Sequence, residues 1–519
     1  MSDSTQSILL SVRQFFSGTL LSRITGLGRD ISMAYAFGAS EAVAALMVAF
    51  RLAHLLRRLF GEGALQTAFI PHFEELRSSN APQAFAFFRQ LSNTLALFLS
   101  LLTMIAMGLL YFSLPYFSTD GQQVAVLTLL MLPSLPFICL FGLNSSLLQC
   151  QKHYFITGAA PAAFNLLWIA GVALSASFSP LKAMNAMAIC IVAACVGQWA
   201  ATLPAIRKQL KNFPNTQDSY FAIAKLRPLA TPFSLAIAGV AATQINSAID
   251  PLFARYADVQ GPAYLWYAIR IEQLPLALFG IALAGALLPP LSRAIKGGHH
   301  EKFSQLYHFA QQKTFTFMAI VTAGIILLGP QLVNVLYGHG DFNNQAAYET
   351  TLCLWAYSLG LIPSALLLIT APAFYAKGNY SIPATASALS VLFSIGSNAF
   401  LVLVCGWGAA SIAVSTSLAA FLNYYYLKWQ LQNTRQAIRV MPIWLCIGLG
   451  SAAAVACEHL FFGWNFSGGF ISQFGLLVLK GCMYCIVLLI SAWLINCREI
   501  LEILRDKKTN LECGDLSPL

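Results

Sequence analysis

The chain is dominated by long, continuously apolar segments that are separated by short polar connectors. A membrane-spanning helix needs about 20 mainly apolar residues, and the sequence contains about fourteen segments of this kind. Barrel strands are excluded because they alternate apolar and polar residues over about 10 positions. Only 10% of the residues are charged, against about 25% in soluble domains. We therefore predict an all-α integral membrane protein with spans at 8–36, 42–72, 88–113, 123–149, 155–177, 185–205, 229–255, 262–289, 312–337, 347–375, 381–404, 409–429, 440–461 and 472–496.

Basic residues are distributed unevenly among the connectors. With the N-terminus in the cytoplasm, the cytoplasmic connectors hold most Lys and Arg residues, and the opposite connectors offer little besides Lys182 and Arg255. The positive-inside rule then predicts an even number of spans and both termini in the cytoplasm. The net charge of +10 therefore reflects membrane insertion and not a nucleic-acid partner. The polar segment Met1–Gln6 lacks the features of a signal peptide, so we expect the first helix to remain in the mature chain.

A faint internal repeat links the second span with the eighth at a shift of about 219 residues, which is the plan of a parallel-repeat transporter. At this shift Arg51 matches Arg270, and Pro71 matches Pro290. The repeat indicates two like-oriented lobes of six helices, followed by two appended helices. The predicted domains are an N-lobe at 1–215, a C-lobe at 216–432, the appended helices at 433–497 and a cytoplasmic tail at 498–519.

Ionisable residues cluster inside three of the predicted spans, where such residues are costly and usually face a cavity or a partner. The arginines outnumber the acids, and the excess positive charge favours an anionic ligand. Arginine forks bind phosphate oxygens through paired, charge-assisted hydrogen bonds, so a phosphate or pyrophosphate group fits best. The cluster consists of Arg23, Arg29, Asp30, Arg51, Arg57, Arg58, Glu62, Arg270 and Glu272.

Several of these residues have a structural alternative that the sequence leaves open. Arg58 and Glu62, four residues apart on one helix face, form either an internal ion pair or part of the ligand site. His54 is either a cavity residue or a buried histidine with satisfied hydrogen bonds. Asp250 in the seventh span either binds a coupling cation or pairs with Arg255 or a neighbouring helix.

Cofactor chemistry finds no support in the sequence. Cys482 and Cys485 form a C-x-x-C, but their neighbours offer no further metal ligands, so we expect them to pack as small apolar residues. A phosphate-binding G-x-x-x-x-G-K-[ST] loop is absent from the sequence, which argues against ATP hydrolysis. We therefore expect no cofactor and no metal, and leave open whether Na⁺ or H⁺ acts as a coupling ion.

The first two spans carry a specific series of short motifs, and the eighth carries a related one. They are Ser22-Arg23, Gly26-Leu27-Gly28-Arg29-Asp30, Phe37-Gly38-Ala39, Leu55-Leu56-Arg57-Arg58-Leu59-Phe60-Gly61-Glu62-Gly63-Ala64, Ala68-Phe69-Ile70-Pro71 and Ala268-Ile269-Arg270. With these motifs the chain resembles the MurJ (MviN) family of bacterial lipid II flippases, within the MOP superfamily of multidrug, oligosaccharidyl-lipid and polysaccharide exporters. The likeness in span number and order covers nearly the whole chain.

This resemblance implies a two-lobed bundle around a central cationic cavity that opens alternately to each side, with the last two helices forming a groove for the lipid tail. It also implies which residues of this chain bind or transport lipid II: Arg23, Arg29, Arg57 and Arg270. The supporting or gating residues that it implies are Ser22, Asp30, His54, Arg58 and Glu62.

The chain departs from the family pattern at four positions. Ala44 replaces a common aspartate, Ile269 an acid, Ala263 a serine and His54 an asparagine. A sodium site of some relatives is matched only weakly, by the candidate ion-site residues Asp250, Ser394 and Asn398. These departures concern gating and ion coupling more than the substrate class.

The resulting hypothesis is a flippase of the bacterial inner membrane that moves lipid II from the inner to the outer leaflet by alternating access. Its expected partners are lipid II, membrane lipids and cell-wall synthesis proteins. Two alternatives remain, namely a drug or organic-cation antiporter of the same superfamily and a cell-wall scaffold that transports nothing. A glycosyltransferase or ligase is disfavoured because the connectors are too short to supply catalytic residues, so we expect a transporter and not an enzyme.

Overall fold

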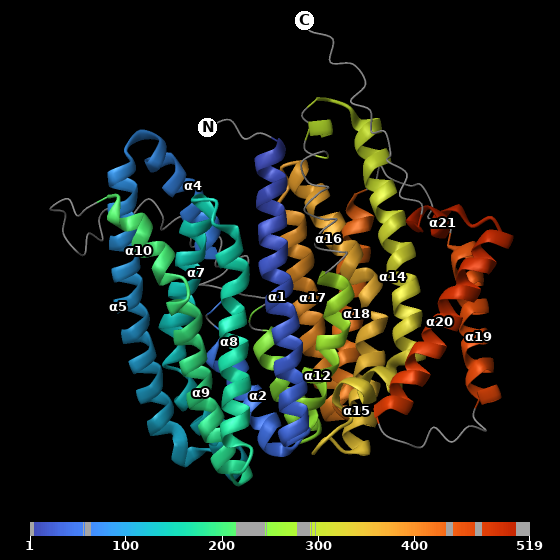
Figure 1. Cartoon of the computed structure of the whole chain (residues 1–519), viewed down its shortest axis with the longest axis horizontal. Coiled ribbons are helices and arrows are strands. Elements are labelled where there is room, and N and C mark those ends of the chain that lie inside the picture. Colours follow the sequence, from blue (N-terminus) through green and yellow to red (C-terminus); the bar gives the residue numbers. More distant parts are fainter. Residues whose placement is uncertain are drawn as a thin grey trace, which may run out of the picture. The chain divides into compact units, whose positions relative to one another are not determined.

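The computed structural model describes residues 5–55, 57, 64–213, 244, 246–277, 291, 293–295, 297–431, 440–461 and 470–504. These residues form helices and no strand, which confirms the all-α prediction. Figure 1 shows the helices, whose bounds are α1 Thr5–Phe37, α2 Glu41–Ala53, α4 Ala64–Ser79, α5 Ala81–Ser113, α6 Thr119–Met131, α7 Ser134–Cys150, α8 Tyr154–Ser175, α9 Pro180–Ala200, α10 Leu203–Lys211, α12 Gly261–Pro275, α14 His300–Tyr337, α15 Asn344–Leu359, α16 Leu361–Ala376, α17 Ser381–Ala399, α18 Ala410–Gln430, α19 Met441–Phe461, α20 Phe470–Leu494 and α21 Arg498–Leu504.

The length and composition of these helices identify an integral membrane protein. Within the described residues, eight helices are long and apolar enough to cross a membrane, or nine if the bent pair α6 and α7 counts as one span. Helices suit the bilayer because they satisfy every backbone hydrogen bond within the segment. The total of about fourteen spans is a count over the whole chain and stays a prediction.

Some predicted spans are divided between two helices in the structure. The predicted span 123–149 consists of α6 and α7, which meet at an angle of 48°, and the span 347–375 consists of α15 and α16. The break between α6 and α7 lies at Leu132-Pro133, because proline has no backbone N–H and its ring clashes with the preceding helical turn. Ser134 opens α7 and donates a hydrogen bond of 2.6 Å to the carbonyl of Met131, an acceptor at the end of α6.

The described chain divides into two compact units. The first unit comprises Met1–Trp266 with His339–Asn343, and the second comprises Tyr267–Gly338 with Asn344–Leu519. In the first unit α1, α8 and α9 run side by side (Figure 1). A Cβ added to Gly18 would lie 2.6 Å from the Phe155 carbonyl oxygen, so α1 and α8 approach more closely than a larger residue permits. The predicted lobe boundary at 215/216 lies outside the described residues.

The second unit contains the two appended helices and a long helix that they contact. α19 and α20 pack against α14, and the Tyr484 hydroxyl donates to the Ile320 carbonyl at 2.9 Å. A second core lies around Tyr307 of α14, whose hydroxyl accepts a 2.7 Å hydrogen bond from Gln311. The predicted tail begins with a short helix, α21, which also contacts α14.

Residues His339–Asn343, which connect α14 to α15, belong to the first unit and contact the end of α1. The Asp341 N–H donates to the Tyr35 carbonyl at 3.0 Å. Gly340 has φ +66°, and a Cβ placed there would lie 2.1 Å from the Tyr35 carbonyl oxygen. The contact therefore requires a glycine both for its backbone conformation and for its close approach.

We expect Gly340→Ala to destabilise the protein by about 2–3 kcal/mol, because a clash with α1 adds to the cost of a positive φ. The thermal unfolding midpoint of the purified protein measures this effect. Gly378→Ala is the matched control, since Gly378 has φ +73° but open space around its Cβ position. Equal losses in the two variants would show that the close approach to Tyr35 contributes nothing.

Candidate substrate-binding site

The centre of the candidate site is a buried ion pair on α1. Arg29 and Asp30 are 7% and 3% exposed. Arg29 donates to one Asp30 carboxylate oxygen from Nη2 at 2.8 Å and from Nε at 3.0 Å. A buried arginine of this kind is stable only with such a partner, since an unpaired charge within the membrane is costly.

Asn165 of α8 holds the same arginine from the neighbouring helix. Its side-chain oxygen accepts a hydrogen bond of 3.2 Å from Arg29 Nη1. Its side-chain nitrogen donates to the Ser22 carbonyl at 3.0 Å and to the Thr25 hydroxyl at 3.2 Å. One amide therefore fixes the guanidinium and a turn of α1 together.

Two tryptophans complete the surroundings of the guanidinium. The Arg29 Cζ atom lies 4.9 Å from the Trp168 ring centroid and 5.7 Å from that of Trp266. The Trp266 indole N–H also donates to Asp30 at 3.3 Å. The charge is thus paired, desolvated and covered by π-systems that favour a cation. The bonds to Asp30 and Asn165 use three of the five N–H groups that an arginine offers.

Arg51 of α2 brings a second positive charge to Trp266. Its Cζ atom lies 5.9 Å from that ring, and its Nη1 donates to the Ser247 hydroxyl at 2.8 Å. Ser247 and Asp250 lie on the same helical segment, and Asp250 accepts a hydrogen bond from Asn246 at 3.2 Å. The first unit therefore carries charged side chains on the consecutive helices α1 and α2 and on the segment of Asp250, which Arg51 reaches across 196 residues through Ser247.

His54 follows α2 and is buried among polar side chains. Its Nδ1 lies 2.9 Å from the Phe50 carbonyl, and its Nε2 lies 3.2 Å from the Ser134 hydroxyl and 3.6 Å from Cys195 Sγ. Of the two alternatives for His54, a cavity residue or a buried histidine with hydrogen-bond partners, the structure shows the second. The broken helix pair positions Ser134 for this contact.

The remaining predicted residues are distributed over both units. Arg23 is exposed on α1, Ser22 and Arg57 are half-buried in the first unit, and Arg270 is half-buried on the part of α12 that belongs to the second unit. Arg58 and Glu62, together with their predicted ion pair, lie outside the described residues.

The candidate ion-site residues also fall into different units. Asp250 belongs to the first unit, whereas Ser394 and Asn398 are buried on α17 of the second. Arg255 forms an ion pair with Asp120 at the start of α6 and donates to the Glu41 and Val259 carbonyls at 3.3 and 3.2 Å. The described contacts of the Arg255 guanidinium are with Asp120 and these two carbonyls, and pairing of Asp250 with Arg255 or a neighbouring helix stays a prediction. Ion coupling at Asp250 and Asn398 stays a prediction.

The comparisons with known proteins identify the family of this chain. The family model described as "Lipid II flippase MurJ" matches residues 33–477. The chain belongs to the MurJ family. A probable lipid II flippase MurJ of Chlamydia trachomatis is 35% identical over 423 residues, which are 81% of this chain and 77% of the relative. The lipid II flippase MurJ of Burkholderia cenocepacia is 29% identical over 458 residues, covering 84% and 85%.

Solved structures show the same fold. A lipid II flippase MurJ in an inward closed conformation matches with a TM-score of 0.73 and 23% identity, covering 94% of this chain and 99% of that one. An inward-facing multidrug resistance MATE family transporter of the MOP superfamily matches with a TM-score of 0.63 and 15% identity, covering 81% and 98%. The predicted membership of the MurJ family and the transporter-type membrane fold are thereby confirmed.

The sequence-based reasoning missed the residues that hold Arg29, namely Asn165, Trp168 and Trp266. Asn165 carries a signal, because it is an isolated amide in the apolar segment 155–177 and buried amides require partners. The tryptophans carry no comparable signal, since aromatic residues are common in apolar spans.

We expect Asn165→Leu to lower the thermal unfolding midpoint, because it leaves Arg29 Nη1 and the Ser22 carbonyl without this partner at a cost of about 1–3 kcal/mol. The test compares unfolding midpoints of purified variants. Thr25→Val removes only the hydroxyl that Asn165 contacts and should cost less. A wild-type midpoint for Asn165→Leu would contradict the anchoring role of this amide.

Proposed function

We propose that this protein is a flippase that moves lipid II from the inner to the outer leaflet of the bacterial cytoplasmic membrane by alternating access. One observation carries the proposal beyond family membership. Arg29 is held by Asp30, Asn165 and two tryptophans, and two of its five N–H groups have no partner among the residues that the structure describes. A preorganised guanidinium in a low-dielectric site suits a pyrophosphate head group.

In the proposed cycle the pyrophosphate enters from the cytoplasmic side and its tail remains in lipid. Arg29 binds the pyrophosphate at the buried site. Arg57, which follows α2, and the exposed Arg23 of α1 supply further positive charge for the same group. Arg270 on α12 is proposed as the fourth ligand, on the basis of the sequence motif. The site then closes toward the cytoplasm and opens to the outer side of the membrane, where the head group is released.

No covalent bond forms or breaks in this cycle, so the proposal is a transporter without a cofactor. The driving force is either the membrane potential, at about 2.3 kcal/mol per charge per 100 mV, or a coupled ion at Asp250 and Asn398. Both termini are proposed to face the cytoplasm, and cell-wall synthesis proteins are proposed as further partners. The likeness to a MATE transporter concerns the fold alone. The excess of membrane arginines supports an anionic substrate better than a drug or organic cation.

The proposal is tested in cells whose own lipid II flippase can be switched off. Expression of this protein should restore lipid II that a membrane-impermeant probe labels at the cell surface. A scaffold would leave the surface signal at the depleted level while being inserted in the membrane. A cation antiporter would do the same and would also lower the accumulation of an organic-cation dye. Either result would overturn the flippase proposal.

A further inference from the structure

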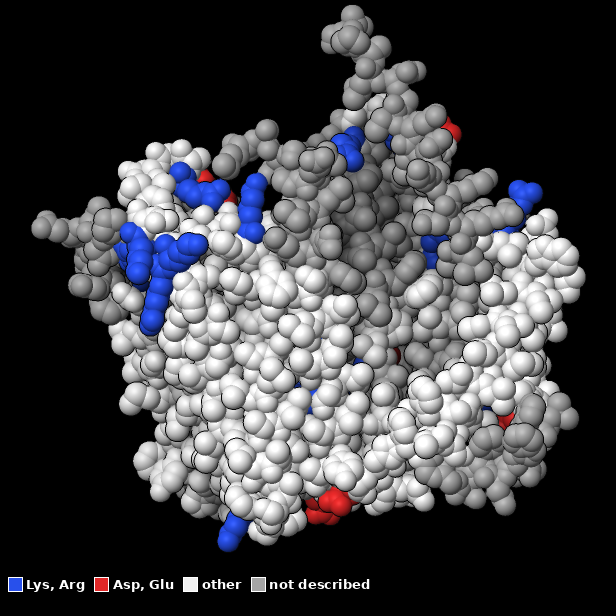
Figure 2. Space-filling view, in the orientation of Figure 1, with Lys and Arg blue, Asp and Glu red and all other residues white. Residues whose placement is uncertain are grey.

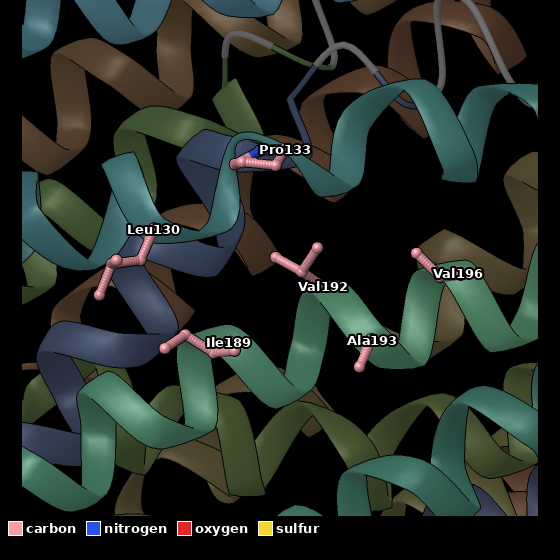
Figure 3. Close-up of a pocket in the computed structure, with 6 residues that line it drawn as sticks. All are labelled: Leu130, Pro133, Ile189, Val192, Ala193 and Val196. Carbon is pink, nitrogen blue, oxygen red and sulfur yellow. The ribbon is translucent and has the colours of Figure 1, made fainter.

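An apolar groove lies on the first unit where α6 and α7 meet beside α9. It is open to the surface, has a volume of about 440 Å³ and is lined by Leu130, Pro133, Ile189, Val192, Ala193 and Val196 (Figure 3). Every one of these side chains is apolar, and the volume falls within the 300–1,000 Å³ range of ligand pockets. The proline break between α6 and α7 leaves the space, because the two helix segments turn away from a straight course.

The groove faces away from the interior of the first unit. The buried side of α9 is formed by Met187, Ile191 and Ala194, each 0% exposed. At about 100° per residue, Ile189, Val192 and Val196 fall on the opposite side of the helix. Ile189 is 59% exposed. In a membrane protein an exposed apolar face of a membrane-spanning helix contacts lipid hydrocarbon.

α10 follows α9 after two residues and presents basic side chains. Arg207, Lys208 and Lys211 are all exposed, and blue side chains gather over α10 in Figure 2. Arg207 follows Ile189 by 18 residues, which is five helical turns at about 3.6 residues per turn. The cations therefore continue the stripe of α9 that lines the groove.

Three contacts hold α10 in place. Arg89 of α5 donates to the Leu210 carbonyl at 3.0 Å and also to the Phe213 carbonyl. Gln209 bonds the His153 ring at 2.9 Å, and Asn144 donates to the Thr202 hydroxyl at 2.9 Å where α10 begins. A fixed helix loses little conformational freedom when its exposed cations bind an anion, so the basic surface is preorganised.

The spacing between the cations and the groove matches one leaflet. Val196, the groove residue of α9 nearest to the cations, precedes Arg207 by 11 positions, or about 17 Å at 1.5 Å per residue. One leaflet contributes about 15 Å of hydrocarbon. A lipid whose phosphate lies beside Arg207 therefore places the end of an acyl chain at the Val196 end of the groove.

We propose that α9, α10 and the α6–α7 break form a binding site for one anionic phospholipid of the leaflet at the α10 end. Its phosphate binds Arg207, with Lys208 and Lys211 on the same short helix, and one acyl chain ends in the groove at Val196. Charge complementarity selects an anionic head group over a zwitterionic one. The site is separate from Arg29 and does not depend on which substrate the protein transports.

Native mass spectrometry of the purified full-length protein tests this proposal by titration with phosphatidylglycerol. Arg207→Gln/Lys211→Gln should weaken binding of one lipid by about 30-fold, since each basic residue near a membrane surface contributes a similar electrostatic increment. The matched control is Arg293→Gln/Lys302→Gln, which removes two exposed cations of the second unit and should leave that binding unchanged. Val196→Trp should also weaken it by filling the near end of the groove.

The proposal is overturned if both double variants bind phosphatidylglycerol like wild type, or if phosphatidylcholine binds the wild type equally well. Displacement of the bound phosphatidylglycerol by equimolar undecaprenyl phosphate would assign the groove to a polyprenyl chain and would also contradict it. Circular dichroism of each variant confirms that the helices are intact. These experiments measure lipid binding and not translocation. Their result therefore stays meaningful even if the protein does not translocate lipid II.

Discussion

Replacing Arg29 with alanine is expected to reduce lipid II translocation by about 30-fold or more, because loss of a desolvated charge partner costs about 2–5 kcal/mol. Arg29 is 7% exposed and is bound by Asp30 and Asn165, so its guanidinium reaches a ligand with little reorganisation. The rate at which labelled lipid II becomes accessible outside proteoliposomes measures the effect. Arg29→Lys should also be impaired, since lysine keeps the charge but lacks the planar fork.

The control for this prediction separates folding from binding. Arg29→Ala leaves the Asp30 carboxylate buried without its ion-pair partner, which destabilises the protein. Arg29→Ala/Asp30→Asn removes both charges and should recover much of the unfolding midpoint while translocation stays low. Wild-type translocation by the double variant would show that the pair only stabilises the fold.

The second large effect is expected in the appended helices. Lys480 of α20 bonds Glu458 of α19 at 2.8 Å, with side-chain exposures of 4% and 31%. Glu458 also lies 3.5 Å from the side-chain nitrogen of Gln331 on α14. Glu458→Gln should lower stability by about 3 kcal/mol, because it leaves the Lys480 ammonium buried without a counter-charge. The fraction of folded protein after heating, followed by size-exclusion chromatography, reports this loss.

A paired replacement distinguishes the charge effect from a general effect of changing α19. Glu458→Gln/Lys480→Met removes the unpaired ammonium and fills its space with an apolar side chain, so stability should return close to that of wild type. If the double variant is less stable than Glu458→Gln alone, the buried charge is not the cause of the loss.

The fold class and the central arginine could be predicted from the sequence for physical reasons. Long apolar segments have few stable alternatives to helices in a bilayer, and all described segments are helical. Arg29 and Asp30 stood out because charges within such segments are costly. The family motif reinforced this choice, since the same residues carry the resemblance.

The rest depends on tertiary contacts that periodicity does not encode. Asn165 reaches Arg29 across 136 residues, and Trp266 reaches Asp30 across 236. The 48° break between α6 and α7 has a local cause in Pro133, yet its consequence, the placement of Ser134 beside His54, involves another helix. Pairing of Arg255 with Asp120 was likewise missed, because α6 precedes that arginine by more than a hundred residues.

Flippase activity can be measured with the purified protein in proteoliposomes that contain lipid II, as the rate at which the lipid II head group becomes accessible to an external probe. We expect accessibility well above that of protein-free liposomes, and its loss with Arg29→Ala at equal protein content. Accessibility equal to that of protein-free liposomes, from a folded wild-type protein under an applied membrane potential and with Na⁺ and proton gradients, would contradict the proposed flippase function.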